Sequence, residues 1–271
     1  MTNLKTFNKK FVIQIKSYII KKNKLEKYYI SKFDYINKNN IKYSIKFYYK
    51  KTQELYYLKM FNISKLDNIH SLFFEQKCLD HPCTNDLGFQ TIVSTFNTFD
   101  NNLINFGFEY YQCIFRCRLK KLELYTKINN FQNLEYLNLR NFIFNRVITF
   151  KLNNLKKLIL FCCQNISFES DSLLKLKHLY LQYSKIVVNP LLKLPNLETI
   201  ELNAIGSDYL YGKYELVFDF QSLKKLKSFK GHKNYFLLLN NTSIENIHIL
   251  GFLGVEKEII EKLNSIQKKK I

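Results

Sequence analysis

The sequence predicts an α/β fold in which short strands stack into a curved parallel β-sheet, with an irregular or short-helical convex side, a degenerate N-terminal part and a C-terminal capping helix. The first observation is a phrase, LxxLxL with aliphatic or aromatic substitutes, that recurs between Leu119 and about Phe252. The second is its spacing, because successive copies begin 15, 21, 21, 21, 26 and 21 residues apart. The third is a helical pattern after Gly254. A fixed period of this length is typical of solenoids built from stacked repeats.

The phrase itself has the period of a β-strand. In the third copy Leu158 and Leu160 point to one face of the strand, whereas the residues between and beside them point to the other. A further apolar residue, three places before most copies, closes the core from the convex side, and one unit alone cannot bury this set. The copies are Leu119-Leu122-Leu124, Leu134-Leu137-Leu139, Leu155-Leu158-Leu160, Leu176-Leu179-Leu181, Leu197-Ile200-Leu202, Leu223-Leu226 with Ser228, and Ile244-Ile247-Ile249; the convex residues are Phe131, Leu152, Leu173, Leu194 and Phe220.

Residues 192–202, with the sequence LKLPNLETIEL, carry the phrase in its most regular form, including Pro195 two places before Leu197. This passage resembles the consensus of leucine-rich repeat proteins, and the resemblance covers residues 119–254. Members of that family usually place Asn or Cys five residues after the second leucine of the phrase, where the side chain caps backbone donors of the turn. Here only Cys163 and Ser184 fill that place, and the other copies have Lys127, Phe142, Ile205, Gly231 and Phe252 there. The resemblance implies a leucine-rich repeat solenoid, a fold that serves as a binding scaffold and does not define a function by itself.

Residues 1–118 form a basic N-terminal part, predicted to be either a cap or degenerate repeats. Residues 1–60 contain 15 Lys against 3 acidic residues, yet the alternation from Ile41 to Phe47 indicates a folded strand and not a disordered arm. Phrases that mimic the repeat occur here at irregular spacing: Leu55-Leu58-Met60, Ile69-Leu72-Phe74 and Leu103-Phe106-Phe108. We favour a continuous solenoid with a degenerate N-terminal third over a separate cap, because no linker rich in Gly, Pro or Ser lies near residue 118.

Two segments depart from the regular pattern near the C-terminus. Residues 205–221 lengthen one unit by five residues and contain Tyr209 and Tyr211, which favours an extended aromatic loop that contacts a partner. From Val255 to Ile266 the apolar residues lie four, four and three places apart, as on one face of a helix. We therefore predict that residues 255–271 form a capping helix.

The chain of 271 residues carries a formal net charge of +20. A charge of this sign is the signature of a protein that binds nucleic acid or an anionic surface. However, the sequence has one Ala (Ala204) and no Trp beside many Lys, Asn, Ile, Phe and Tyr residues, which is the composition of a very AT-rich coding sequence. Because this bias explains part of the lysine excess, binding of nucleic acid or an anionic surface is the alternative and not the first prediction.

The six cysteines bear on compartment and on metal binding. No secretory signal accompanies them, and no apolar run reaches the roughly 18–20 residues of a membrane span, so we expect an intracellular monomer, cytoplasmic or nuclear, with reduced thiols. Cys78, His81 and Cys83 can offer metal ligands, with Cys113 and Cys117 as a second pair, but this spacing is not that of a familiar zinc site. A loop with incidental thiols explains the segment as well, so no metal and no cofactor is predicted.

Residues that alternate with the leucines must face out of the sheet, which defines a candidate partner-binding face. The place between the second and third leucines of the phrase holds Glu123, Asn138, Ile159, Tyr180, Glu201, Lys227 and His248. In the middle of this face the alternation predicts an aromatic patch with a cationic rim, and Tyr and Arg are enriched at interface hot spots. The alternative is that the chain's own residues cover the patch. The predicted site comprises Tyr136, Arg140, Ile159, Phe161, His178, Tyr180 and Tyr183, with Tyr209 and Tyr211 as flanking contacts.

No motif in the sequence points to catalysis. It contains no Gly-rich phosphate loop, GxSxG or HExxH, and its five His are scattered. We therefore predict a non-enzymatic scaffold that binds a protein partner, of identity left open, through the concave sheet face. Besides the nucleic-acid alternative, a second alternative is the substrate adaptor of a ubiquitin ligase, in which an F-box precedes such repeats; the Leu-Pro opening of an F-box is not found in residues 1–118.

Overall fold

The dominant element of the fold is a ten-stranded parallel β-sheet, seen in a computed structural model that describes residues 11–16, 43–49, 69–76, 103, 105–109, 128–140, 142–169, 171–184, 186–187, 192–203, 219–239, 244–250 and 257–268. Its strands lie in chain order, interrupted only where β6 and β8 leave the sheet. They are β1 (Phe11–Lys16), β2 (Tyr43–Tyr49), β3 (Ile69–Gln76), β4 (Asn105–Glu109), β5 (Tyr136–Arg140), β7 (Lys157–Phe161), β9 (His178–Gln182), β10 (Thr199–Asn203), β11 (Ser228–His232) and β12 (Asn246–Leu250). The predicted parallel sheet is thus confirmed.

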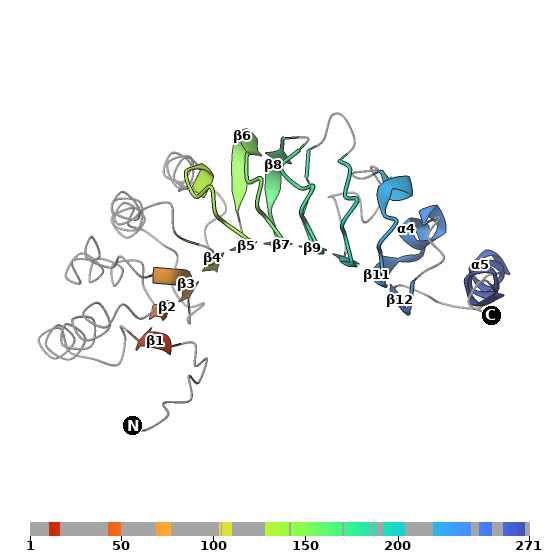
Figure 1. Ribbon diagram of the computed structural model, residues 1–271, viewed down its shortest axis with the longest axis horizontal. Helices are drawn as coiled ribbons and strands as arrows, with labels where there is room; N and C mark the ends of the chain where they lie inside the picture. The colour runs from red at the N-terminus through yellow and green to blue at the C-terminus, as the bar shows by residue number, and fades with distance from the viewer. Residues whose placement is uncertain are drawn as a thin grey trace, which may run out of the picture.

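The sheet runs along the inner side of an arc, and the other elements stand on its outer side (Figure 1). There β6 (Ile143–Phe150) and β8 (Gln164–Phe168) pair in parallel, followed by the 3-10 helix η4 (Phe220–Ser222) and the helix α4 (Lys233–Leu238). The expected irregular or short-helical convex side is therefore wrong at β6 and β8. Aromatic and β-branched side chains favour strands, and β6 buries Phe144, Ile148 and Phe150 where it pairs with β8.

Strands in the middle of the sheet follow one another at a constant step along the chain. Tyr136 of β5 pairs with Lys157 of β7, Lys157 with His178 of β9, and His178 with Thr199 of β10. A constant step keeps equivalent residues in register, so the apolar side chains form continuous rows through the core. One row contains Ile45, Leu72, Phe106, Leu137, Leu158, Leu179 and Ile200 and the other Leu139, Leu160, Leu181 and Leu202, each no more than 2% exposed.

The register of β11 differs from the predicted one by three residues. Phe229, and not Leu226, pairs with Ile200, which makes the step from β10 to β11 longer than the constant step that joins β5, β7, β9 and β10. Leu226 instead precedes the strand as Leu197 does, because the N–H of each donates to the carbonyl three residues before it. The strand centred on Leu226 is therefore a wrong prediction.

The physical reason for this shift is the pair Phe229 and Gly231. Phe229 buries a large ring in the core, where it is 1% exposed. A Cβ added at Gly231 would lie 3.0 Å from the Phe229 ring, so the small residue beside the ring makes room for it.

The predicted strand containing Leu122 lies outside the described residues, and β4 pairs directly with β5.

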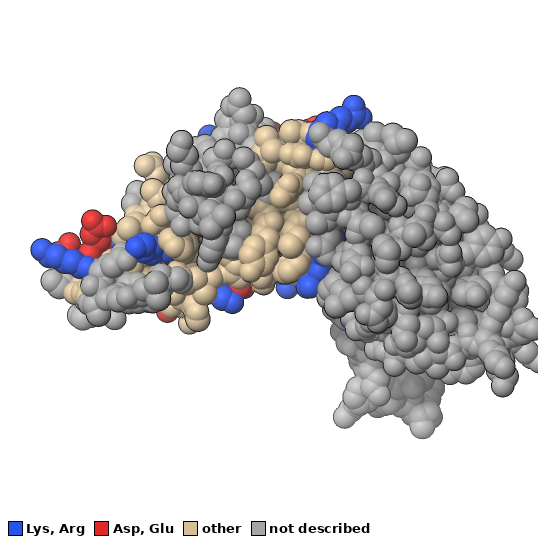
Figure 2. Space-filling view, turned by 180° about the vertical axis from the view of Figure 1, so that it is seen from behind, with Lys and Arg blue, Asp and Glu red and all other residues tan. Residues whose placement is uncertain are grey.

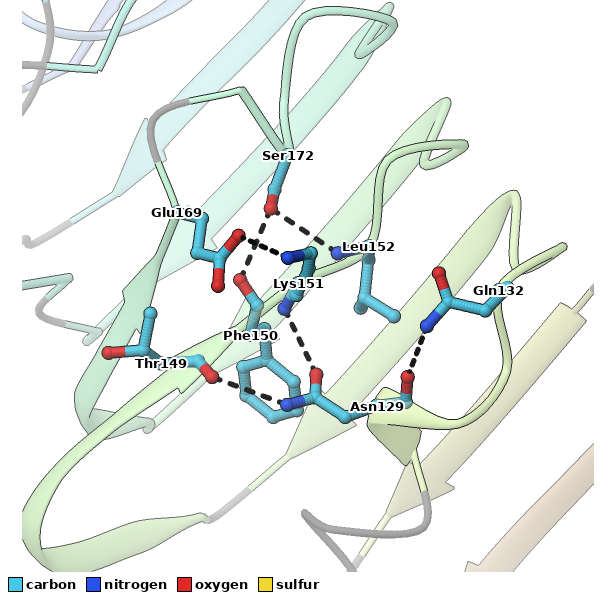
Figure 3. A network of polar contacts seen from close by, with 8 residues as sticks. All are labelled: Asn129, Gln132, Thr149, Phe150, Lys151, Leu152, Glu169 and Ser172. Atoms are coloured by element: carbon cyan, nitrogen blue, oxygen red, sulfur yellow. Dashed lines mark hydrogen bonds and ion pairs between the residues drawn. The ribbon is translucent and has the colours of Figure 1, made fainter.

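Polar side chains tie neighbouring units together away from the sheet (Figure 3). The buried Ser172 hydroxyl accepts a hydrogen bond from the N–H of Leu152 and donates to the carbonyl of Phe150, each at 3.3 Å. The side-chain carbonyl oxygen of Asn129 accepts from the N–H of Lys151 at 3.0 Å. These side chains thus bond backbone groups about 20 residues away in the chain, before Ser172 and after Asn129.

A second link follows β7 and β9, at the place that the family resemblance singles out. Cys162 and Tyr183, at equivalent places in neighbouring units, both adopt left-handed backbone, with φ of 51° and 50°. The next residues, Cys163 and Ser184, are buried. The Ser184 hydroxyl accepts from the N–H of Cys163 and donates to the carbonyl of Gln182, each at 2.9 Å. The side chain of Ser184 thus satisfies backbone groups of the turns that follow β7 and β9.

Replacing Ser184 with Ala is expected to lower the free energy of unfolding by about 1–3 kcal/mol, because the buried N–H of Cys163 loses its acceptor. Urea denaturation followed by circular dichroism measures the change. Ser167→Ala is the matched control, since Ser167 is half-buried in β8. Equal midpoints for Ser184→Ala and the control would contradict the assigned role of this hydroxyl.

The predicted C-terminal helix is present as α5 (Lys257–Lys268). Its apolar face buries Ile259 and Ile266, and Leu263 packs partly against the same core. The Lys262 ammonium donates to the carbonyl of Leu237 in α4, and the burial of this side chain lowers the pKa of Lys262.

Within the part of the chain that the structure describes, no helix is long and apolar enough to cross a membrane.

Candidate functional site

The inner side of the sheet presents the side chains that alternate with the buried rows. All seven predicted site residues lie here or directly beside it. Six of them are half-buried and Tyr183, just after β9, is 54% exposed, so the chain's own residues do not bury the patch. We define the sheet face as Tyr136, Asn138, Arg140, Lys157, Ile159, Phe161, His178, Tyr180, Gln182, Tyr183, Thr199, Glu201 and Asn203.

The middle row of this face consists of the residues between the two buried positions of each strand. It extends into β3 and β4, which the sequence did not predict, and its residue in β11 is not the predicted one. Phe73 and Gly107 precede Asn138 in the same row, by the register of β3, β4 and β5. Lys230 follows Glu201, so the prediction of Lys227 at this place is wrong for the same reason as the register of β11. Glu123, also predicted for this row, lies outside the described residues.

Tyr136 is the centre of an aromatic cluster at the β4–β5 junction. The ring of Phe73 packs edge-on against it, with centroids 5.9 Å apart, and the Lys157 ammonium lies 5.5 Å from its centroid. Phe73 reaches Tyr136 across Gly107, where an added Cβ would lie 2.5 Å from the Phe73 ring. Sequence reasoning missed Phe73, although it stands between Leu72 and Phe74 of a phrase that mimics the repeat.

Burial also sets the chemistry of this cluster. It raises the pKa of the Tyr136 phenol, and the hydrogen bond with Asn138 and the charges of Arg140 and Lys46 oppose the rise only in part. The phenol is therefore neutral at physiological pH. A neutral ring with a lysine over its face is a cation–π arrangement, which is worth about 0.5–1 kcal/mol at exposed sites.

Phe161 is the centre of a second aromatic contact, where β7 ends. The Arg140 guanidinium lies 5.7 Å from its ring centroid, and the ring of Tyr183 stands edge-on with centroids 6.0 Å apart. Tyr183 has left-handed backbone, and its ring lies beside Phe161 and is exposed. The predicted aromatic patch with a cationic rim is thus assembled from three neighbouring strands.

Between these contacts and β11 lies an open depression of about 280 Å³. The Nδ1 atom of His178 lies 2.6 Å from the Thr199 hydroxyl, and the Tyr180 hydroxyl donates to the Gln182 side-chain carbonyl at 2.8 Å. Its lining side chains include Lys157, Ile159, His178, Tyr180, Thr199, Glu201, Ser228 and Lys230. His178 and Tyr180 were predicted site residues, and the structure brings them together with Ile159.

The pKa of His178 lies below its ordinary value. Burial is the largest cause, the charges of Lys157 and Lys177 act in the same direction, and the Glu198 carboxylate opposes them. Free His178 is therefore neutral at pH 7. A neutral ring that bonds through Nδ1 leaves Nε2 as the nitrogen for a ligand.

Charged residues around the sheet face are largely paired. Lys156 bonds Glu135 at 2.7 Å, Lys177 bonds Glu198 at 2.9 Å, and Lys230 bonds Glu201. On the side that it shows, Figure 2 likewise presents the described basic and acidic side chains in several separate groups and not as one basic stripe. Pairing of this kind reduces the positive potential that the net charge of the chain implies.

Two groups of predicted residues fall outside the described residues, namely Tyr209 and Tyr211 of the long loop and the set Cys78, His81 and Cys83. Among the residues that the structure describes, no three His, Cys, Asp or Glu side chains gather as metal ligands would. Comparisons with protein-family models, with curated proteins and with solved structures find no match for this chain.

Proposed function

We propose that the chain is a non-enzymatic leucine-rich repeat solenoid that binds a protein partner through the concave face of its sheet. The observation that carries the proposal is the group of aromatic rings on this face, each held by neighbours and yet partly exposed. Aromatic and Arg side chains fixed at the centre of a surface are the residues that dominate protein interfaces. Their positions on short parallel strands keep them rigid, which lowers the entropy cost of binding.

Three features support the solenoid part of the proposal. The same step along the chain recurs between β5, β7, β9 and β10. Continuous apolar rows are shared by neighbouring strands, so that no unit closes its core alone. Outside the sheet, Asn154 and Asn196 each donate to a carbonyl of the preceding unit, at 2.9 and 2.8 Å.

The contacts of the lysines favour a protein over a nucleic acid. A phosphate-binding groove needs free cations along its length. Here Lys177 is paired with Glu198, and the Lys225 ammonium donates to the Asn196 side chain away from the sheet face. On the sheet face itself, Lys157 lies over the Tyr136 ring, and Lys230, next to Glu201 in the middle row, is paired with that carboxylate.

A pulldown with the full chain at roughly physiological salt, with and without nuclease, tests the class of partner. We expect stoichiometric recovery of a protein, unchanged by nuclease, and affinity that depends only weakly on salt. A nucleic-acid binder would instead lose affinity with a slope near −0.9Z on a log–log plot, where Z is the number of phosphates contacted. Recovery of nucleic acid without a stoichiometric protein would overturn the proposal.

A further inference from the structure

The depression at the centre of the sheet face has the donors of an anion site. Lys157 and Lys230 contribute ammonium groups, and Thr199, Ser228 and His178 contribute neutral polar groups. The one carboxylate in the lining, Glu201, is paired with Lys230. The lining therefore carries two cations and one anion. Because Glu201 pairs with Lys230, Lys157 is left without a carboxylate in the depression.

Lys157 is placed to receive a negatively charged group. It is exposed, and among the described residues it has no carboxylate partner. Its ammonium rests 5.5 Å from the Tyr136 ring centroid, a contact that holds the cation without neutralising it. Ile159 and the Tyr180 ring line the same depression and offer apolar contact to methylene groups.

The size and surroundings of the site favour an amino-acid side chain over a polyanion. Of the described residues, only one uncompensated cation faces the depression, whereas Lys156 and Lys177, which do not line it, are held in ion pairs. The aromatic contacts of Phe161 and Tyr183 lie on the adjoining strand ends, where apolar residues flanking an acidic one can dock. One charge with apolar neighbours is the pattern of an extended peptide and not of a nucleic-acid backbone.

We propose that this depression binds the carboxylate of an Asp or Glu side chain in an extended segment of the partner protein, with Lys157 as the cation and His178 Nε2 as a hydrogen-bond donor. The inference rests on the proposed function, which it deepens by naming the chemistry of the partner. Thr199 holds His178 through Nδ1, which directs the other ring nitrogen to the ligand.

The site also makes binding depend on pH. A carboxylate beside His178 raises the pKa of this residue, which in the free chain is lowered by burial, by Lys157 and by Lys177 against the opposing Glu198. Because the complex then binds a proton more tightly than the free chain does, affinity increases as the pH falls toward the pKa of His178 in the complex. Glu201 and Lys230, which also line the depression, form an ion pair with each other, and the bond to Glu201 raises the pKa of Lys230.

The test uses a phage-displayed random library of 12-residue peptides, selected on the immobilised full chain. The strongest peptide is synthesised with its acidic residue and with Gln or Asn in that place, and Kd is measured by fluorescence polarisation for wild type, Lys157→Gln, His178→Gln, Phe161→Ala and Lys193→Gln. The binding of a fluorescent single-stranded DNA to wild type and Lys157→Gln is measured in the same way. Lys193 is exposed and lies outside the depression, so its variant is the control. Thermal melts of all variants show that each is folded.

We expect selected peptides to be acidic, and the acid-to-amide change to weaken binding about tenfold in wild type but little in Lys157→Gln. Lowering the pH from 7.5 to 6.0 should tighten binding in wild type and not in His178→Gln. Peptides that lose binding in Phe161→Ala but contain no essential acidic residue would overturn this inference and leave the proposed function standing. Selection of no peptide that depends on Phe161, or binding of single-stranded DNA through Lys157, would contradict both.

Discussion

Replacing Leu158 with Asp is expected to unfold the central strands of the sheet. Leu158 is fully buried between Leu137 and Leu179 in the register of β5, β7 and β9. A carboxylate at this place would be a buried charge in an apolar row, and leaving a buried charge without a partner costs about 3–5 kcal/mol. Since domains of this kind have roughly 5–15 kcal/mol of stability, the loss removes most of it.

Circular dichroism and a urea titration measure this effect. Ile159→Asp is the matched control, because Ile159 is the next residue of the same strand and faces outward, half-buried. The control should keep a cooperative transition near that of the wild type. A Leu158→Asp variant that melts cooperatively at the wild-type midpoint would refute the assignment of faces in β7.

The second large effect is expected at Phe161, in binding and not in folding. Phe161→Ala removes the ring that contacts both Arg140 and Tyr183, so it disrupts the patch as a whole. Truncating a hot-spot aromatic typically costs about 2 kcal/mol or more, which corresponds to roughly thirtyfold weaker binding of the recovered partner. Lys156→Ala is the control, because its exposed ion pair with Glu135 contributes little.

An alanine scan compares the effect of Phe161→Ala with the effects of alanine at other residues of the face and its border. The scan covers Tyr136, Arg140, Lys157, Phe161, Lys177, His178, Tyr180, Tyr183 and Lys225, with Kd measured by calorimetry. The proposal ranks the central aromatics above Lys177 and Lys225, both of which bond within the chain. A basic groove would give the reverse order, and a flat profile would mean that the partner binds elsewhere.

The sequence predicts the sheet and most of its face because both depend on spacing alone. A constant step along the chain places Tyr136, Lys157 and His178 side by side whatever the rest of the chain does. Alternation in a strand then separates buried leucines from outward residues. Alternation alone indicates the buried faces of Ile45, Leu72 and Phe106, which lie in the core row although their spacing in the sequence is irregular.

The failures arise where two registers satisfy the same pattern. Leu223 and Leu226 have the spacing of the phrase, but Phe229 is the residue that pairs with Ile200 and lies in the core. The spacing of apolar residues does not show whether Leu226 or Phe229 fills the core better. The pairing of β6 with β8 was missed because it depends on contacts between units. Phe73 was not predicted as a site residue because its ring in β3 contacts Tyr136 in β5 over Gly107 of the intervening strand β4. A contact between strands that are not adjacent cannot be predicted from a local sequence pattern.

Site-specific photo-crosslinking tests the central proposal, that the concave sheet face is the binding surface, most directly. Benzoylphenylalanine is placed at Ile159, in the middle of the sheet face, or at Val147, which is 47% exposed in β6 on the outer side. Both chains are incubated with the partner recovered in the pulldown and irradiated. The proposal predicts a crosslinked species with the probe at Ile159 and none with the probe at Val147. Crosslinking from Val147 alone would show that the partner binds the convex side and would contradict it.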